Sequence, residues 1–183
     1  MDHNDHVNLL RLAELSPGAS FADLGAGSGA FTLALRELLG LSADVYAVDR
    51  NQNQLTILEQ AHRSKFGSVE NLHLIPADFT GAVSLPPLDG ILMANSLHFV
   101  KDKRKVLRRV RSFLKPGGVL LLVEYNVDRG NPWVPRPLSF ETFRDLTPRA
   151  GFSQPRLLAT AASSFLREFY SAVTYREDDS KIE

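Results

Sequence analysis

The stretch FADLGAGSGAF, from Phe21 to Phe31, places three glycines within five positions, at Gly25, Gly27 and Gly29. A short apolar run precedes the glycines and an apolar run with helical periodicity follows them, which predicts a strand that leads into a helix. Glycine at such a junction adopts backbone angles closed to other residues and lets a ligand touch the main chain. The unpaired N–H groups of the helix N-terminus attract an anion. The stretch therefore predicts a cradle for a ligand with an anionic end.

Short apolar runs alternate with longer periodic runs on either side of this stretch. Strands are predicted over residues 20–25, 43–49, 71–78, 88–95 and 119–125. Helices are predicted over residues 4–15, 30–40, 51–67 and 101–114, and a turn over 115–118. The strands are continuous apolar runs, which are typical of a parallel sheet covered on both faces. The repeated order of strand and helix predicts right-handed crossovers and an α/β sandwich.

The character of the chain changes after residue 125. Three prolines fall within residues 126–138, which we expect to form a loop. A helix is predicted over residues 139–152 and two last strands over 155–162 and 165–176. The charged tail, residues 177–183, is expected to fray. The prediction is a single domain over residues 1–183.

The composition favours a soluble cytoplasmic protein. The chain has 183 residues, 44% of them hydrophobic, and a formal net charge of zero, so its overall charge gives no attraction to nucleic acid or to an anionic membrane. It contains no cysteine, which excludes disulfides and thiolate chemistry and fits a reducing interior. The first residues lack the order of a signal peptide, and no apolar run approaches a membrane span. The five histidines show no metal-binding spacing, so no metal is predicted.

Asp49, at the end of the second predicted strand, narrows the choice of ligand. A carboxylate at this place accepts from both hydroxyls of a ribose. The dinucleotide pattern G-x-G-x-x-G/A is met by Gly25, Gly27 and Ala30, but this match alone is weak. The pattern acidic-x-G-x-G-x-G is also met, with Asp23 as the acidic residue. A carboxylate beside a pyrophosphate is unfavourable, whereas the ammonium group of S-adenosylmethionine needs a nearby acceptor.

The sequence resembles the class I S-adenosylmethionine-dependent methyltransferases over roughly residues 15–176. The resemblance depends on five motifs in a fixed order: SPGASFADLGAGSGAF, VYAVDRN, LIPADFT, LDGILMANSLHFV and LKPGGVLLLVEY. It implies a Rossmann-like doubly wound sheet of seven strands in the order 3-2-1-4-5-7-6, with strand 7 antiparallel. It also implies S-adenosyl-L-methionine as cofactor and S-adenosyl-L-homocysteine as product.

The resemblance also implies a set of cofactor-binding residues. These are Asp23, Gly25, Ala26, Gly27, Gly29, Asp49, Arg50, Asp78, Phe79 and Asn95. The glycines line the methionine part with Asp23 in support, and Asp49 holds the ribose. Arg50 and Phe79 lie beside the adenine, and Asp78 accepts from its amino group. Plainer interpretations stay open, because Asp49 and Asp78 are also suited to capping a strand end and a turn.

Asn95 is implied to face the methionine end and the transferable methyl, although a role as a loop hydrogen-bonder stays open. The segment after it reads Ser96-Leu97-His98 where methylators of amides and nucleobases often have P-P-Y/F, which resembles the small-molecule branch. His98 is the candidate catalytic residue, because its intrinsic pKa suits a general base. The favoured alternative is that His98 packs beside Phe99 and shapes the pocket.

Trp133 and Arg136 are candidates for the acceptor rim, with an equally weighted alternative in which Trp133 anchors its loop. Residues 101–111 carry seven basic residues and one acid, which we interpret as a solvated helix face rather than a nucleic-acid site. The chain has little with which to enclose an acceptor, so we expect an open cleft or a lid from a partner, and a homodimer stays an option. The predicted function is methylation of a small molecule. The alternatives are a non-catalytic, cofactor-binding partner subunit and an NAD-dependent oxidoreductase.

Overall fold

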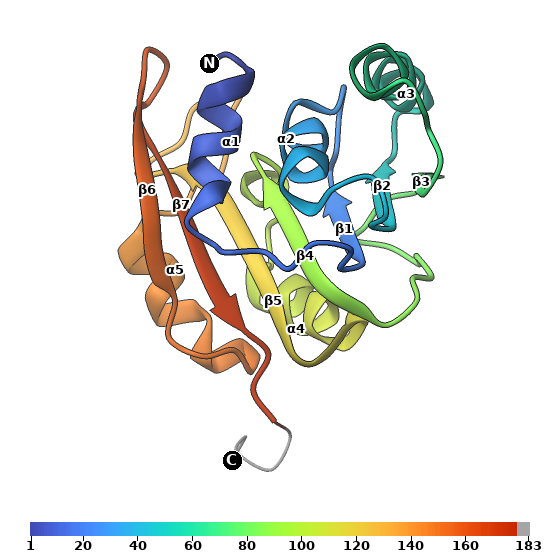
Figure 1. The fold of residues 1–183 in the computed structure, drawn as a ribbon. Helices are drawn as coiled ribbons and strands as arrows, with labels where there is room; N and C mark the ends of the chain where they lie inside the picture. The colour runs from blue at the N-terminus through green and yellow to red at the C-terminus, as the bar shows by residue number, and fades with distance from the viewer. Residues whose placement is uncertain (179–183) are drawn as a thin grey trace.

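A computed structural model of the protein describes residues 1–178 and contains one sheet of seven strands (Figure 1). The strands are β1 (Phe21–Leu24), β2 (Val45–Asp49), β3 (Leu72–Pro76), β4 (Leu88–Ala94), β5 (Leu114–Tyr125), β6 (Arg156–Ser163) and β7 (Arg167–Tyr175). The helices are α1 (His3–Arg11), α2 (Ala30–Leu39), α3 (Gln52–Phe66), α4 (Lys103–Phe113) and α5 (Phe140–Leu146), with two 3-10 helices, η1 (Leu97–Phe99) and η2 (Pro148–Ala150).

The strand order is β3-β2-β1-β4-β5-β7-β6, which confirms the predicted topology. β1 pairs in parallel with both β2 and β4, and β7 runs antiparallel to both β5 and β6. The order of the strands reverses between β1 and β4, because the chain leaves β1 toward β2 and β3 and returns to place β4 on the other side of β1. Ligands bind at the carboxyl ends of the strands at such a switch point.

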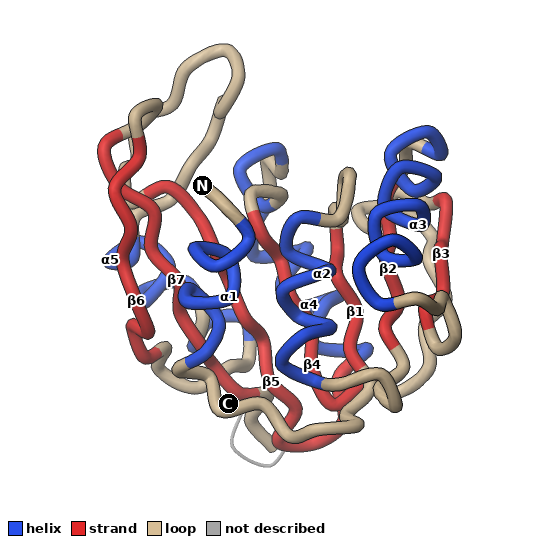
Figure 2. The backbone as a smooth tube through the Cα atoms, turned by 45° about the horizontal axis from the view of Figure 1, so that its top comes forward, coloured by secondary structure: helices blue, strands red, loops and turns tan. Residues whose placement is uncertain are grey.

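Alternate residues of the strands enter two separate hydrophobic cores. Ile91 and Met93 pack in the core that α4 and α5 cover, and Leu92 packs in the core that α1 and α2 cover. Figure 2 shows these helices on opposite faces of the sheet, with α3 on the same face as α2. Coverage of both faces explains why the central strands are rich in apolar residues. β3 lies at an edge of the sheet, and none of its five residues is fully buried.

Three predicted element boundaries are wrong. The first helix ends at Arg11 rather than at residue 15, because the chain turns toward β1 through Glu14 at φ +52°. The helix predicted over 139–152 is divided into α5 and η2 at Pro148, which has no N–H to continue the α-helical bonding. The predicted turn at 115–118 lies inside β5, where the pairing with β4 shifts register between Leu88 and Gly90.

Part of the predicted frayed tail is held in place. Glu177 donates its backbone N–H to the Gly151 carbonyl over 3.2 Å, and its own carbonyl accepts from Arg111 over 2.6 Å. The remainder of that prediction, over 179–183, lies outside the described residues. Within residues 1–178, no helix is long and apolar enough to cross a membrane.

Candidate cofactor and acceptor site

A cleft of about 650 Å³ lies at the carboxyl ends of β1, β2, β3 and β4. It brings together seven of the ten predicted cofactor-binding residues, Gly25, Gly27, Asp49, Arg50, Asp78, Phe79 and Asn95. Asp23 and Ala26 line a smaller hollow of about 250 Å³ on the other side of the glycine loop. Gly25, Gly27 and Asn95 line both spaces. Gly29 lines neither, since it caps α2 and packs against Leu58.

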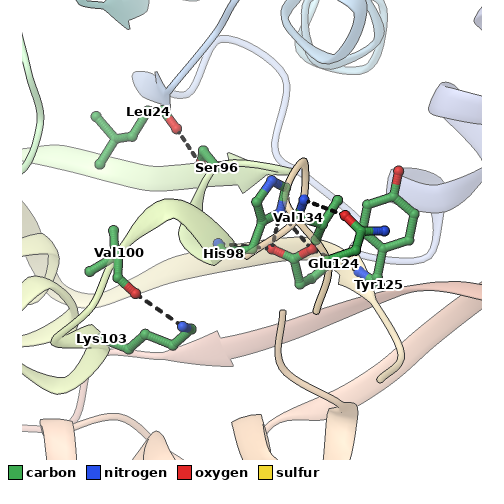
Figure 3. A network of polar contacts seen from close by, with 9 residues as sticks. Leu24, Ser96, His98, Val100, Lys103, Glu124, Tyr125 and Val134 are labelled. Atoms are coloured by element: carbon green, nitrogen blue, oxygen red, sulfur yellow. Dashed lines mark hydrogen bonds and ion pairs between the residues drawn. The ribbon is translucent and has the colours of Figure 1, made fainter. Parts of the chain in front are cut away.

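The backbone of the glycine loop requires glycine at Gly25. Its φ of +86° lies in the left-handed region, and a Cβ there would lie 2.5 Å from the Cβ of Ser96. Ser96 in turn donates its hydroxyl hydrogen to the Leu24 carbonyl over 2.7 Å, so that it cannot move aside freely (Figure 3). The end of β1 and the segment after β4 are therefore packed directly against each other, and the bare backbone of Gly25 faces the cleft.

Asp49 fixes the loop from the neighbouring strand. Its Oδ2 accepts the backbone N–H of Gly27 over 2.9 Å, and its Oδ1 accepts the backbone N–H of Asn51 over 2.8 Å. Each carboxylate oxygen has a further lone pair available to a ligand. The carboxylate therefore has two tasks open to it, since it orders the glycine loop and lines the cleft.

Asp78 shows the turn-capping interaction that the plainer interpretation proposed. Its Oδ1 accepts from the backbone N–H and the hydroxyl of Thr80 over 2.8 and 2.6 Å, and these bonds hold the pKa of Asp78 below its usual value. Its Oδ2 has no protein donor among the interactions that the described residues make. Phe79 lies directly after it and lines the cleft, and its ring is 3.4 Å from the position that a Cβ at Gly25 would take.

Asp23 is a carboxylate buried beneath the loop, with 1% of its surface exposed. Its Oδ2 accepts the Thr32 hydroxyl over 2.7 Å, whereas its Oδ1 has no hydrogen-bond partner. Burial raises the pKa of Asp23 to about 7, the nearby charge of Asp49 acts in the same direction, and the Thr32 hydrogen bond opposes both. An unpaired, buried acceptor at this place is an energetic cost that a cationic ligand would remove.

Asn95 presents a second unpaired acceptor to the same small hollow. It follows β4 at φ +52°, a conformation that is unusual for a residue other than glycine, and its buried Oδ1 has no partner. Backbone strain and an unsatisfied polar atom at one residue are typical of a functional site. His6 of α1 also lines this hollow, and it contacts Phe31 edge to face at a centroid distance of 4.6 Å.

Comparison with known proteins identifies the family. The family described as "Methyltransferase domain" matches residues 22–120, more than half of the chain. The chain belongs to the class I S-adenosylmethionine-dependent methyltransferases. Its cofactor is S-adenosylmethionine. The alternative of an NAD-dependent oxidoreductase is thereby set aside.

Two curated methyltransferases illustrate the similarity. Acetylserotonin O-methyltransferase of Mus musculus is 32% identical over 171 residues, which cover 81% of this chain and 43% of the relative. Arsenite methyltransferase of Aquipseudomonas alcaligenes is 31% identical over 193 residues, which cover 88% of this chain and 55% of the relative. The chain thus spans about half the length of the curated relatives it matches.

Solved structures share the fold of this methyltransferase. The YcgJ protein of Bacillus subtilis superposes with a TM-score of 0.78 at 15% identity, over 96% of this chain and 100% of that one. A SAM-dependent methyltransferase from Aquifex aeolicus superposes with a TM-score of 0.72 at 21% identity, over 93% of this chain and 89% of that one.

His98, the candidate catalytic residue, is buried and does not line the cleft. Its Nδ1 lies 2.9 and 3.0 Å from the two carboxylate oxygens of Glu124, and its backbone N–H donates to the same carboxylate over 3.2 Å (Figure 3). Glu124 is fully buried in β5. The His98 ring packs on Phe99 at a centroid distance of 4.2 Å, and Phe99 lines the cleft. This arrangement matches the favoured prediction, in which His98 packs beside Phe99.

The loop after β5 lies beside this network. Trp133 is 72% exposed and therefore does not anchor the loop, whereas Val134 is buried. Arg136 donates its backbone N–H to the His98 carbonyl over 3.1 Å, and its side chain is exposed. Neither Trp133 nor Arg136 lines the cleft itself.

The basic residues of α4 tie this helix to its neighbours. Arg108 donates to the Arg149 carbonyl over 3.3 Å, Arg109 donates to the Thr80 carbonyl over 3.4 Å, and Arg111 donates to the Gly151 carbonyl over 2.9 Å. These three arginines are thus bonded to the protein rather than only solvated, as the prediction of a solvated helix face had it. Within residues 1–178, no group of three metal-ligating side chains is found.

Sequence reasoning missed two contributors to the site. The sequence predicts no role for Ser96. Ser96 packs against Gly25, and this contact arises only because β4 lies beside β1. Glu124 was also missed, although the sequence held a signal for it. A carboxylate inside the apolar run VLLLVEY needs a buried partner, and His98 is that partner.

Proposed function

We propose that this chain transfers a methyl group from S-adenosylmethionine to a small-molecule acceptor and releases S-adenosylhomocysteine. When bound, S-adenosylmethionine supplies an electrophilic methyl on a sulfonium. The chain's own task is to hold that methyl in line with a nucleophile in the cleft.

The observation that carries the proposal is the pair of unpaired, buried acceptors at the glycine loop. Asp23 and Asn95 both line one hollow, and the buried Oδ1 of each has no donor from the protein. An ammonium group offers several N–H donors and a positive charge, so it satisfies both oxygens and favours the ionised form of Asp23. The exposed backbone of Gly25 allows the ligand to approach closely.

The remaining predicted residues fit the nucleoside part. Asp49 has a lone pair open on each oxygen for the ribose hydroxyls, and Asp78 Oδ2 is open for an amino group. Phe79 and Arg50 supply an aromatic face and a cation beside it, both in the cleft.

The cleft favours an acceptor that brings its own lone pair. Among the described residues that line it, the only ionisable acids are Asp49 and Asp78, which already accept hydrogen bonds, and no histidine is present. An amine, a thiolate or an ionised hydroxyl needs no general base, unlike a neutral alcohol. We therefore assign His98 a positioning role: with Glu124 it holds Phe99 at the cleft wall.

Calorimetric titration with S-adenosylmethionine, S-adenosylhomocysteine and NAD tests the ligand, and we expect only the first two to bind. Incubation of the enzyme with labelled cofactor and a metabolite extract, followed by mass identification of the product, tests turnover. Binding without any labelled product from extracts or from a panel of amines and phenols would favour the alternative of a non-catalytic partner subunit. A lack of binding would refute the proposal.

A further inference from the structure

A series of aromatic rings leads from the cofactor cleft to the turn between β6 and β7. Phe99 lines the cleft and is 58% exposed. The ring centroids of His98 and Tyr125 lie 6.2 Å apart, and those of Tyr125 and Phe165 lie 6.1 Å apart. Phe165 also meets the ring of Trp133 at 6.3 Å, edge to face. The series therefore has exposed rings at its two ends, Phe99 at the cleft and Phe165 at the β6–β7 turn, and the buried ring of His98 between them.

Two arginines flank a hollow at the far end of this series. The hollow has a volume of about 660 Å³ and lies between residues 127–130 and residues 163–167. Its lining includes Arg129, Arg167 and Phe165. Within residues 1–178, neither guanidinium is paired with a carboxylate. The nearest acids in sequence are already engaged, since Asp128 accepts from Ser139 and Glu168 accepts from Asn126.

The loop that carries Arg129 is fixed relative to the cleft. A Cβ at Gly130 would lie 2.2 Å from the Val134 carbonyl oxygen, so the loop crosses itself at van der Waals contact. Asn131 Oδ1 accepts the backbone N–H groups of Trp133 and Val134 over 3.0 and 2.9 Å. The bond from Arg136 to the His98 carbonyl joins the loop to the cleft wall. The hollow is thus preorganised, which lowers the entropic cost of binding.

We propose that this hollow binds the carboxylate end of an extended aromatic methyl acceptor, whose other end reaches the cofactor cleft. Guanidinium groups bind carboxylates through two parallel hydrogen bonds, and aromatic rings favour stacking with a planar ligand. Free positive charge next to the exposed rings of Phe165 and Trp133 is complementary to that chemistry. The inference rests on the proposed methyltransferase function.

The test uses 4-hydroxycinnamate as probe and its uncharged methyl ester as the matched ligand, both titrated by calorimetry into the chain saturated with S-adenosylhomocysteine. We expect the carboxylate to bind about tenfold more tightly than the ester. In the double variant Arg129→Gln/Arg167→Gln this preference disappears and the affinity of the ester is unchanged. Arg63→Gln is the control, because Arg63 is an exposed arginine on α3 paired only with Glu59. Trp133 is the only tryptophan, so its fluorescence reports whether the probe binds beside it.

The results separate this inference from the proposed function. If S-adenosylhomocysteine binds but the two probes bind equally, or the double variant retains the preference, the carboxylate site is refuted and the methyltransferase assignment stands. If S-adenosylhomocysteine itself fails to bind, the proposed function fails first. If the wild type sediments as a dimer and the double variant as a monomer, the hollow is a subunit interface and the inference is wrong.

Discussion

We expect Asp23 to make the affinity for the cofactor depend on pH. The unliganded carboxyl has a pKa of about 7 because it is buried, and its Oδ1 is unpaired. A bound ammonium group would interact favourably with the carboxylate but not with the neutral acid. Binding therefore requires loss of the Asp23 proton, and affinity for S-adenosylhomocysteine rises with pH.

The size of the effect follows from the fraction of ionised carboxyl. With a pKa of about 7, Asp23 is about 10% ionised at pH 6 and about 75% ionised at pH 7.5. The apparent dissociation constant scales inversely with this fraction, so we expect it to fall about eightfold over this range, or about 1.2 kcal/mol.

Calorimetry at pH 6, 6.75 and 7.5, in two buffers of different ionisation enthalpy, measures both the affinity and the protons released. In Asp23→Asn the affinity should be lower and independent of pH. His6→Gln is the control for the other titrating group in the hollow, whose pKa burial lowers. An affinity of the wild type that is unchanged from pH 6 to pH 7.5, or a pH dependence that survives in Asp23→Asn, would refute the reasoning.

The Asp23 carboxyl also makes the stability of the unliganded fold depend on pH, and this stability falls as the pH rises. A raised pKa means that its contribution to stability is complete below about pH 4 and is lost as the pH rises through 7. Asp23→Asn should therefore melt at a higher temperature than the wild type at pH 8 without ligand. A variant that melts at a lower temperature would show that Asp23 stabilises the unliganded fold.

Four further changes test other parts of the structure. Gly25→Ala should destabilise the fold by about 2–4 kcal/mol in urea titration, because it combines a left-handed backbone with a contact against Ser96, and it should abolish cofactor binding. Asp49→Ala should weaken binding of S-adenosylhomocysteine at least tenfold by calorimetry; unchanged affinity would disprove the ribose assignment. Arg36→Leu should cost about 3–5 kcal/mol, because the buried guanidinium donates to three or more backbone carbonyls and to His62. Burial lowers the pKa of His62 in the folded state. The stability that the neutral imidazole contributes is therefore present above about pH 6.5 and is lost as the pH falls through the lower pKa of the folded state. The difference in urea midpoint between wild type and His62→Gln should thus shrink from pH 7.5 to pH 5.5.

The topology of the sheet was predictable because it depends on patterns that are local in sequence. Each strand was predicted from a short apolar run. The strand order 3-2-1-4-5-7-6 was implied by the resemblance to the family, which depends on five motifs in a fixed order. The errors occur where tertiary demands override local preference, as at Glu14, whose left-handed backbone turns the chain toward β1. Pro148, by contrast, is a local signal that divides the predicted helix.

The site was predictable where its residues lie at the carboxyl ends of strands that the sequence also predicts. Asp49, Gly25 and Gly27 lie in the cleft at the ends of β2 and β1, as the sequence predicted, whereas Gly29 does not line it. The contacts between segments distant in sequence were not predictable. Examples are the packing of Ser96 against Gly25 and the bonding of Glu124 to His98, which arise only when β4 lies between β1 and β5.

In the loop after β5, the hydrogen bonds to the rest of the protein lie at the two ends of the loop. Asn126 and Asp128 accept from the backbone at the start of α5, and Arg136 is bonded to η1, so the stem is closed independently of residues 129–135. Replacement of residues 129–135 therefore leaves in place the hydrogen bonds that close the stem of the loop. We expect a chain with a different sequence at residues 129–135 to keep the geometry of the sheet and of the glycine loop.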